Sequence, residues 1–149
     1  SDYTIGVFDS LAKLLLNPVV KCVVKPFMKD VYKYVPVFNR LKEEHKAGKD
    51  PILRKATALL LIHTPKSNRF GSEDANLAYQ NASLMAQSLG VSQIYMGFVL
   101  TAIRQEGKDT LAKTLGIHGN IQAIMALGIP AFKYPKYTDR KEIVKNYIE

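Results

Sequence analysis

The sequence predicts a single α+β domain, with helices in the first third and alternating strands and helices afterwards. The chain has 149 residues, which is the length of one typical domain. Its composition, 47% hydrophobic and 23% charged, is that of a globular protein. The apolar pattern changes near Asp50-Pro51 from helical spacing to short continuous runs. We therefore expect one domain with two parts, a lysine-rich helical segment at 1–50 and a strand-containing part at 51–149.

The first 50 residues predict three helices. Apolar residues recur at helical spacing over residues 4–16, and Asn17-Pro18 ends this pattern. A second helix is expected at 19–34, with an interruption or a kink at Pro26. A third helix is expected at 37–46.

Lysines recur at every fourth position of the second predicted helix, which would place them on one face. This lysine ridge consists of Lys21, Lys25, Lys29 and Lys33. A solvated helix face is the simpler interpretation, and docking on an acidic protein or an anionic membrane surface is the other. The chain carries a net charge of +8, which favours acidic partners.

The second part predicts two buried strands and one long helix. Residues 58–63 form a continuous apolar run that suits a central strand buried on both faces, with His63 as a hydrogen-bonded core residue. The helix should begin with Ser72 as its N-cap and end at Gly90, where glycine accepts a left-handed conformation. Its many alanines would allow another backbone to approach closely. Residues 121–127 predict the second buried strand.

Shorter elements are expected around these. Residues 94–98 predict an extended segment, and Gly107 breaks the helical pattern of residues 101–115. Asp109 can cap the helix that follows this break, and residues 142–148 predict a last short helix. The single cysteine, Cys22, excludes an intramolecular disulfide and a zinc knuckle, and its apolar surroundings predict a packing role.

Most catalytic signatures are missing from the sequence. It has no nucleophile elbow, no H-E-x-x-H pair, no P-loop and no dinucleotide-binding glycine motif, and its three histidines have no metal-ligand spacing. We therefore name no catalytic or metal-binding side chain. No apolar run approaches the roughly 18 residues of a membrane span, and the basic residues form no recognisable nucleic-acid motif. We expect a soluble cytoplasmic protein, and Ser1 in place of Met predicts a fragment of a longer chain.

An ordered set of motifs between Pro51 and Lys141 resembles the C-terminal half of the nitroreductase family of FMN-dependent oxidoreductases. The motifs are Pro51-Ile-Leu-Arg-Lys-Ala56, Ser72-Glu-Asp74, Met85-Ala-Gln-Ser-Leu-Gly90, Val91-Ser-Gln-Ile-Tyr-Met-Gly97, Leu115-Gly-Ile117 and the Leu-Gly-Ile-Pro that ends at Pro130. The run His63-Thr-Pro-Lys-Ser-Asn68 is most similar to the branch in which this domain follows a ferredoxin-like iron–sulfur domain. Nothing in residues 1–50 resembles the arginine-rich helix start of the family. The resemblance therefore implies a nitroreductase-like sheet flanked by helices, truncated at its N-terminal end.

The same resemblance implies a homodimer with FMN at the subunit interface, where the helix at 73–89 packs. It places Tyr95, Met96 and Gly97 against the flavin ring, with backbone N–H groups serving flavin N5 or O4. It places Arg140, or next Lys136, on the FMN phosphate. The implied reaction is ping-pong hydride transfer from NAD(P)H, or from a ferredoxin-like donor, through FMN to a nitroaromatic, quinone or similar small-molecule acceptor.

A second interpretation stays open at this point. The chain would then be a non-catalytic or degenerate flavoprotein fragment that docks its lysine ridge and basic tail on an acidic electron-transfer protein or a membrane surface. Salt-sensitive binding without flavin dependence would distinguish this module from an enzyme, which retains flavin.

Overall fold

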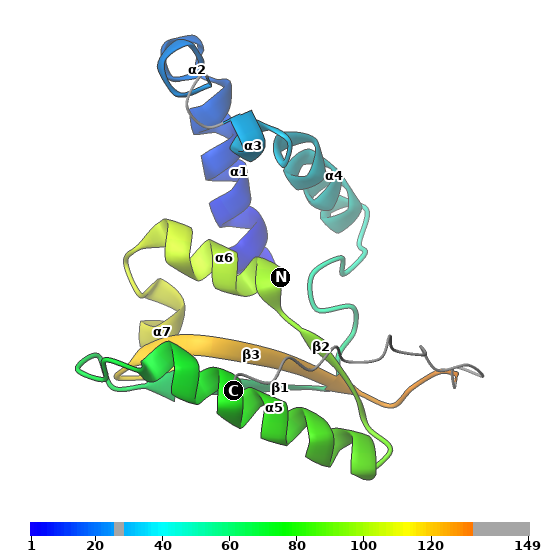
Figure 1. Ribbon diagram of the computed structural model, residues 1–149. Helices are drawn as coiled ribbons and strands as arrows, with labels where there is room; N and C mark the ends of the chain where they lie inside the picture. Colours follow the sequence, from blue (N-terminus) through cyan, green and yellow to red (C-terminus); the bar gives the residue numbers. More distant parts are fainter. Residues whose placement is uncertain (26–28, 133–149) are drawn as a thin grey trace, which may run out of the picture.

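The computed structural model describes residues 1–25 and 29–132 of the chain. The elements are α1 (Asp2–Leu16), α2 (Pro18–Val24), α3 (Lys29–Tyr32), α4 (Val35–Lys46), β1 (Ala58–Thr64), α5 (Gly71–Ser88), β2 (Ser92–Tyr95), α6 (Gly97–Glu106), α7 (Thr110–Thr114) and β3 (Asn120–Gly128). Figure 1 shows a small sheet with α5 along it, and α1 and α4 rising from the side that carries α6. The mixed helix and strand architecture confirms the predicted α+β class.

The sheet has three strands in the order β1-β3-β2, and both pairings are antiparallel. The central strand is therefore β3, and the prediction of a central strand at residues 58–63 is wrong. β1 is an edge strand that leaves Leu59 40% and Leu60 37% exposed, and His63 is exposed as well. A continuous apolar run indicates strand burial, but it cannot say which strand has neighbours on both sides.

Alternating residues of β3 face two different layers of the molecule. Ile124 and Ala126 belong to the main apolar core, together with residues of α1, α4 and α6. Ala123 and Met125 are fully buried on the opposite face, where α5 packs against all three strands. The main core thus joins residues 1–50 to the rest of the described chain.

An aromatic stack ties the helices of the first part to α6. Phe8 of α1 is 1% exposed, and its ring stacks on Phe38 of α4 at a centroid distance of 4.4 Å. The same ring meets Phe98 of α6 edge-on at 5.9 Å. Because Phe98 lies in the first turn of α6, the packing of α1 bears directly on the β2–α6 junction.

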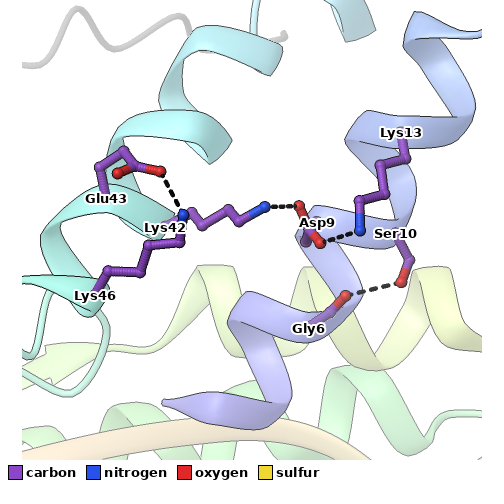
Figure 2. Close-up of polar contacts among 7 residues, drawn as sticks. All are labelled: Gly6, Asp9, Ser10, Lys13, Lys42, Glu43 and Lys46. Atoms are coloured by element: carbon purple, nitrogen blue, oxygen red, sulfur yellow. Dashed lines mark hydrogen bonds and ion pairs between the residues drawn. The ribbon is translucent and has the colours of Figure 1, made fainter.

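A polar clamp adds to this packing between α1 and α4 (Figure 2). The Asp9 carboxylate pairs with Lys13 one turn along α1 at 2.8 Å and with Lys42 of α4. Hydrogen bonds from Lys13 and Lys42 lower the pKa of Asp9 to about 2. The carboxylate therefore stays charged across the physiological pH range, and it links the two helices electrostatically.

The predicted second helix is divided, and the lysine ridge is divided with it. α2 ends at Val24, before the predicted break at Pro26, and α3 begins only at Lys29. Lys21 and Lys25 are exposed at α2, whereas Lys33 pairs with Asp30 at 2.6 Å. The single continuous lysine face was therefore wrong, and so was the packing role of Cys22, which is exposed.

The predicted long helix is present as α5, and Gly90 follows it with a φ of 71°, as expected of a left-handed glycine. Ser72 is not its N-cap, because the helix already begins at Gly71. An added Cβ at Gly71 would collide with the Thr64 side chain, so only glycine allows this close contact with β1. Asn68 organises the preceding turn by accepting a hydrogen bond from the Phe70 N–H at 2.9 Å.

The segment after α5 differs from the prediction in its second half. The extended conformation covers β2 and ends at Tyr95, and residues 97 and 98 already belong to α6. Gly107 ends α6 with a φ of 65°, which confirms the predicted break. Asp109 precedes α7, but its side chain makes no cap and pairs with Lys66 at 2.6 Å instead. The helix predicted at 142–148 lies outside the described residues.

Candidate functional site

An open depression of about 350 Å³ lies where β2 passes into α6. One wall is the chain between α4 and β1, which runs beside this junction in Figure 1. The lining residues are Pro51, Ile52, Arg54, Ile94, Tyr95, Met96, Gly97, Phe98 and Thr101. Tyr95 is 46% and Phe98 38% exposed, so aromatic surface is available to a flat ligand. The structure thus brings Tyr95, Met96 and Gly97, which were predicted as ring contacts, to one wall of one depression.

Backbone donors at the start of α6 add polarity to this wall. The Met96 N–H is already used, because it donates to the Ile124 carbonyl at 3.0 Å. The N–H groups of Gly97 and Phe98 have no acceptor among the described residues, and α6 has no side-chain cap. Unpaired N–H groups of a first helical turn are free to bind an acceptor atom of a ligand.

The Tyr95 ring packs against Tyr79, which a short hydrogen-bond network fixes in turn. The Tyr79 ring of α5 meets the Tyr95 ring edge-on, with centroids 5.1 Å apart and an interplanar angle of 79°. The Tyr79 hydroxyl donates to Gln93, and the Gln93 amide donates to Ser83 at 3.1 Å. Burial, with a smaller contribution from Tyr95, raises the pKa of Tyr79. The Tyr79 hydroxyl is therefore protonated at neutral pH, as its donor role requires.

The loop that forms the other wall is folded around one carboxylate. Asp50 accepts hydrogen bonds from the backbone N–H of Leu53 at 3.0 Å and of Lys55 at 3.1 Å, and from the Ser1 hydroxyl. Partial burial alone would raise the pKa of Asp50, but these hydrogen bonds outweigh it and hold the pKa below its usual range. Arg54 and Lys55 both adopt left-handed backbone conformations, with φ of 54° and 58°.

A second depression, of about 500 Å³, lies between α1 and α6 and is lined in part by Gly6. Two carboxylates, Asp2 and Glu106, and one lysine, Lys108, line it. Glu106 stays ionised, because hydrogen bonds that Thr110 and Tyr3 donate to its carboxylate lower its pKa. The net charge of this lining is negative, so an anionic ligand is favoured at the depression that carries Arg54 instead.

Two of the predicted site residues, Lys136 and Arg140, lie outside the described residues. Sequence analysis missed Arg54 as a lining residue of the depression and Tyr79 as the ring that contacts Tyr95. Arg54 stood in one of the family-like motifs, but nothing in the sequence marks a left-handed arginine. Tyr79 occupies an ordinary helical position, and only the packing of α5 on β2 brings it to Tyr95.

The sequence pattern of the Nitroreductase family matches residues 7–129 of the chain. This match covers most of the chain. The chain belongs to the nitroreductase family. The match begins within α1, so the restriction of the resemblance to residues from Pro51 onward was too narrow. Residues 1–50 contain no arginine-rich helix start, so their motifs alone do not indicate the family.

A solved structure supports the fold of this nitroreductase-family chain. The structure of this chain is similar to the crystal structure of an FMN-bound nitroreductase from Bacteroides fragilis, with a TM-score of 0.57 and 19% sequence identity. The similarity covers 74% of this chain and 60% of the Bacteroides fragilis chain. No curated protein matches the sequence.

In the described part of the chain, no helix is long and apolar enough to cross a membrane.

Proposed function

We propose that this nitroreductase-family chain is an FMN-dependent oxidoreductase that holds its flavin at Tyr95, Met96 and Gly97. One observation carries the proposal: Gly97 and Phe98, whose N–H groups have no acceptor among the described residues, line one open depression together with the exposed Tyr95. A flavin ring is flat, largely apolar and rimmed by acceptor atoms, and this combination of surfaces complements it. The residues present therefore fit the cofactor that the family implies.

The protein's part in the reaction is to bind and orient. Tyr95 offers an aromatic face that the Tyr79 ring fixes from behind, and the Gly97 N–H offers a hydrogen bond to an acceptor atom of the ring. Arg140, or next Lys136, remains our prediction for the phosphate contact. FMN, when bound, supplies the hydride or single-electron chemistry, for which the protein needs no acidic or basic side chain.

The electron donor and acceptor follow from the family rather than from the depression. We propose NAD(P)H as donor, or a ferredoxin-like protein if the chain belongs to the ferredoxin-linked branch. The net charge of +8 would favour an acidic donor protein. The proposed acceptor is a nitroaromatic, a quinone or a similar small molecule, and the proposed compartment is the cytoplasm.

We further propose that the active form is a homodimer. α5 turns Ala75 and Ala86 toward the sheet, where both are buried, and leaves Leu77 68%, Leu84 60% and Met85 62% exposed. So much exposed apolar surface on one helix is typical of a subunit interface. The proposed interface face is then the one that carries Leu77, Leu84 and Met85, because Ala75 and Ala86 already contact the chain's own sheet.

The alternative of a non-catalytic basic module is less well supported. Its lysine ridge is divided between α2 and α3, and Lys33 is paired within its own helical region. Described residues thus give no continuous basic helix face for an acidic partner.

Flavin titration of matched glycine variants tests the proposed site. An added Cβ at Gly97 would make only ordinary contacts with the Tyr95 ring, at 3.8 and 3.9 Å, so a side chain can begin there without a clash, and the first variant is Gly97→Val. We expect this variant to lose FMN affinity at least tenfold. Gly6→Val is the control, because Gly6 lines the other depression and has open space around it. Equal FMN affinity of the two variants would remove the Tyr95–Gly97 wall from the proposal.

A further inference from the structure

We propose that the depression takes a small-molecule substrate with an anionic group, and that Arg54 binds this group. The inference rests on the proposed function, because it names the class of molecule that the flavin site receives. The expected substrate combines a flat apolar body with a carboxylate or a phosphate.

Among the described residues, Arg54 is the only charged one that lines this depression. Its guanidinium forms no ion pair with any carboxylate of the described residues. Asp50, the nearest acid in the sequence, is already occupied by the Ser1 hydroxyl and two backbone N–H groups. Within the described part of the chain, no carboxylate therefore competes with an anion that enters the depression.

The backbone at Arg54 adopts a left-handed conformation that is energetically unfavourable for a non-glycine residue. Non-glycine residues rarely adopt positive φ, and each such residue costs on the order of 1–3 kcal/mol. Arg54 and Lys55 are two such residues in succession. Their conformation is stabilised by Asp50, whose carboxylate accepts hydrogen bonds from the Leu53 and Lys55 N–H groups and whose carbonyl accepts one from the Arg54 N–H at 3.1 Å. Such local strain is concentrated at functional sites, and here the strained Arg54 is one of the residues that line the depression.

The remaining lining decides the rest of the substrate. Ile94 and Phe98, 47% and 38% exposed, give the depression an apolar surface, and the buried Ile52 and Met96 lie beneath it. Arginine binds carboxylates and phosphates through two parallel hydrogen bonds, which fixes orientation as well as charge. An aromatic acid would place its ring on the apolar lining and its carboxylate on Arg54. A neutral analogue of the same shape would lose the second contact.

The anion could also be the phosphate of FMN itself. We assign Arg54 to the substrate, because the arginine shares one small depression with the residues proposed to contact the flavin ring. The phosphate lies at the far end of the flavin side chain. Comparison of FMN with riboflavin, which lacks the phosphate, distinguishes the two sources.

Reoxidation of the reduced flavoprotein by two matched acceptors tests the assignment. The dithionite-reduced protein is mixed with 4-nitrobenzoate or 4-nitrobenzamide, and the return of flavin absorbance gives the second-order rate constant, with no natural donor needed. We expect the wild-type chain to favour the carboxylate, and Arg54→Gln to reduce this preference about tenfold, as for loss of a charged hydrogen bond. Lys55→Gln makes the same charge change outside this depression and should leave the preference intact.

The other possible results also support or refute the assignment of Arg54 to the substrate. An unchanged acceptor preference in Arg54→Gln, with flavin bound, overturns the inference and leaves the proposed function standing. A variant that loses affinity for FMN but not for riboflavin overturns it too, because the guanidinium then serves the phosphate. If no variant and no wild-type protein binds flavin, the proposed function fails. NMR titration of the flavin-free chain with the two acceptors then decides: selective carboxylate binding that requires Arg54 supports the inference, and equal binding refutes it.

Discussion

Truncation of the Phe8 side chain is the perturbation that links the helices of residues 1–50 most directly to the site. Phe8 is 1% exposed and contacts both Phe38 and Phe98. Removal of a buried phenylalanine typically costs 3–5 kcal/mol, the sum of lost burial and of the cavity that remains. This range includes two ring contacts worth roughly 0.5–1.5 kcal/mol each. We expect Phe8→Ala to lower the free energy of unfolding by about 4 kcal/mol, at the middle of that range.

Urea unfolding followed by circular dichroism measures this loss, provided that the slope of the transition stays unchanged. A domain with a typical stability of roughly 5–15 kcal/mol could be nearly unfolded by Phe8→Ala. Phe8→Leu, which keeps apolar volume but loses the rings, is therefore the working variant, with an expected loss of about 1–2 kcal/mol. Leu14→Ala is the control on the same helix, because Leu14 is 57% exposed and its change should stay within about 0.5 kcal/mol.

The refuting result is an unfolding free energy of Phe8→Ala within about 1 kcal/mol of the wild-type value, well below the range for a buried phenylalanine. The helices of residues 1–50 would then be a loose attachment rather than part of the core that supports the β2–α6 junction.

Four further predictions address single residues. Asp50→Ala should destabilise the chain by about 1–3 kcal/mol in urea unfolding, and Asp50→Asn by less, because the amide keeps one acceptor oxygen for two of the three donors; equal losses would contradict this role. The pKa of Asp9 lies at about 2 in the folded state, below its ordinary value of 3.8. Its contribution to stability is therefore complete above about pH 4 and is lost as the pH falls toward 2, and Asp9→Asn should flatten this part of the pH–stability curve. Tyr79→Leu should weaken FMN binding severalfold in a fluorescence titration, whereas Tyr79→Phe, which keeps the ring contact with Tyr95, should weaken it less; the reverse order would make the hydroxyl the important group. Arg140→Ala should weaken FMN binding by roughly 1.5–3 kcal/mol in the same titration, the range for a hydrogen bond to a charged group. Unchanged affinity would leave Lys136 as the better assignment for the phosphate.

The sequence was sufficient for features that depend on local chemistry. Gly90 follows α5 in a left-handed conformation as predicted, because few other residues adopt positive φ at little cost. The helix break predicted at Gly107 is also present. The extended segment predicted at residues 94–98 is correct for Ile94 and Tyr95, although α6 begins at Gly97, earlier than expected. The conformation at each of these positions is determined by residues that are close in the sequence.

Features that depend on distant parts of the chain could not be predicted. The order of strands follows from pairing between residues far apart in the sequence, such as Leu61 with Ile124. The left-handed pair Arg54 and Lys55 is held by Asp50, which itself bonds to Ser1 49 positions away. No local sequence pattern contains this information, so Arg54, the charged residue that lines the depression, was not among the predicted site residues.

The most direct test of the central claim is gel filtration of the chain after incubation with excess FMN, with flavin and protein absorbance recorded together. Our account predicts that flavin elutes with the protein at the position of a dimer, and that Gly97→Val elutes without it. Elution of all flavin in the salt volume, from a wild-type chain that circular dichroism shows to be folded, would contradict the account.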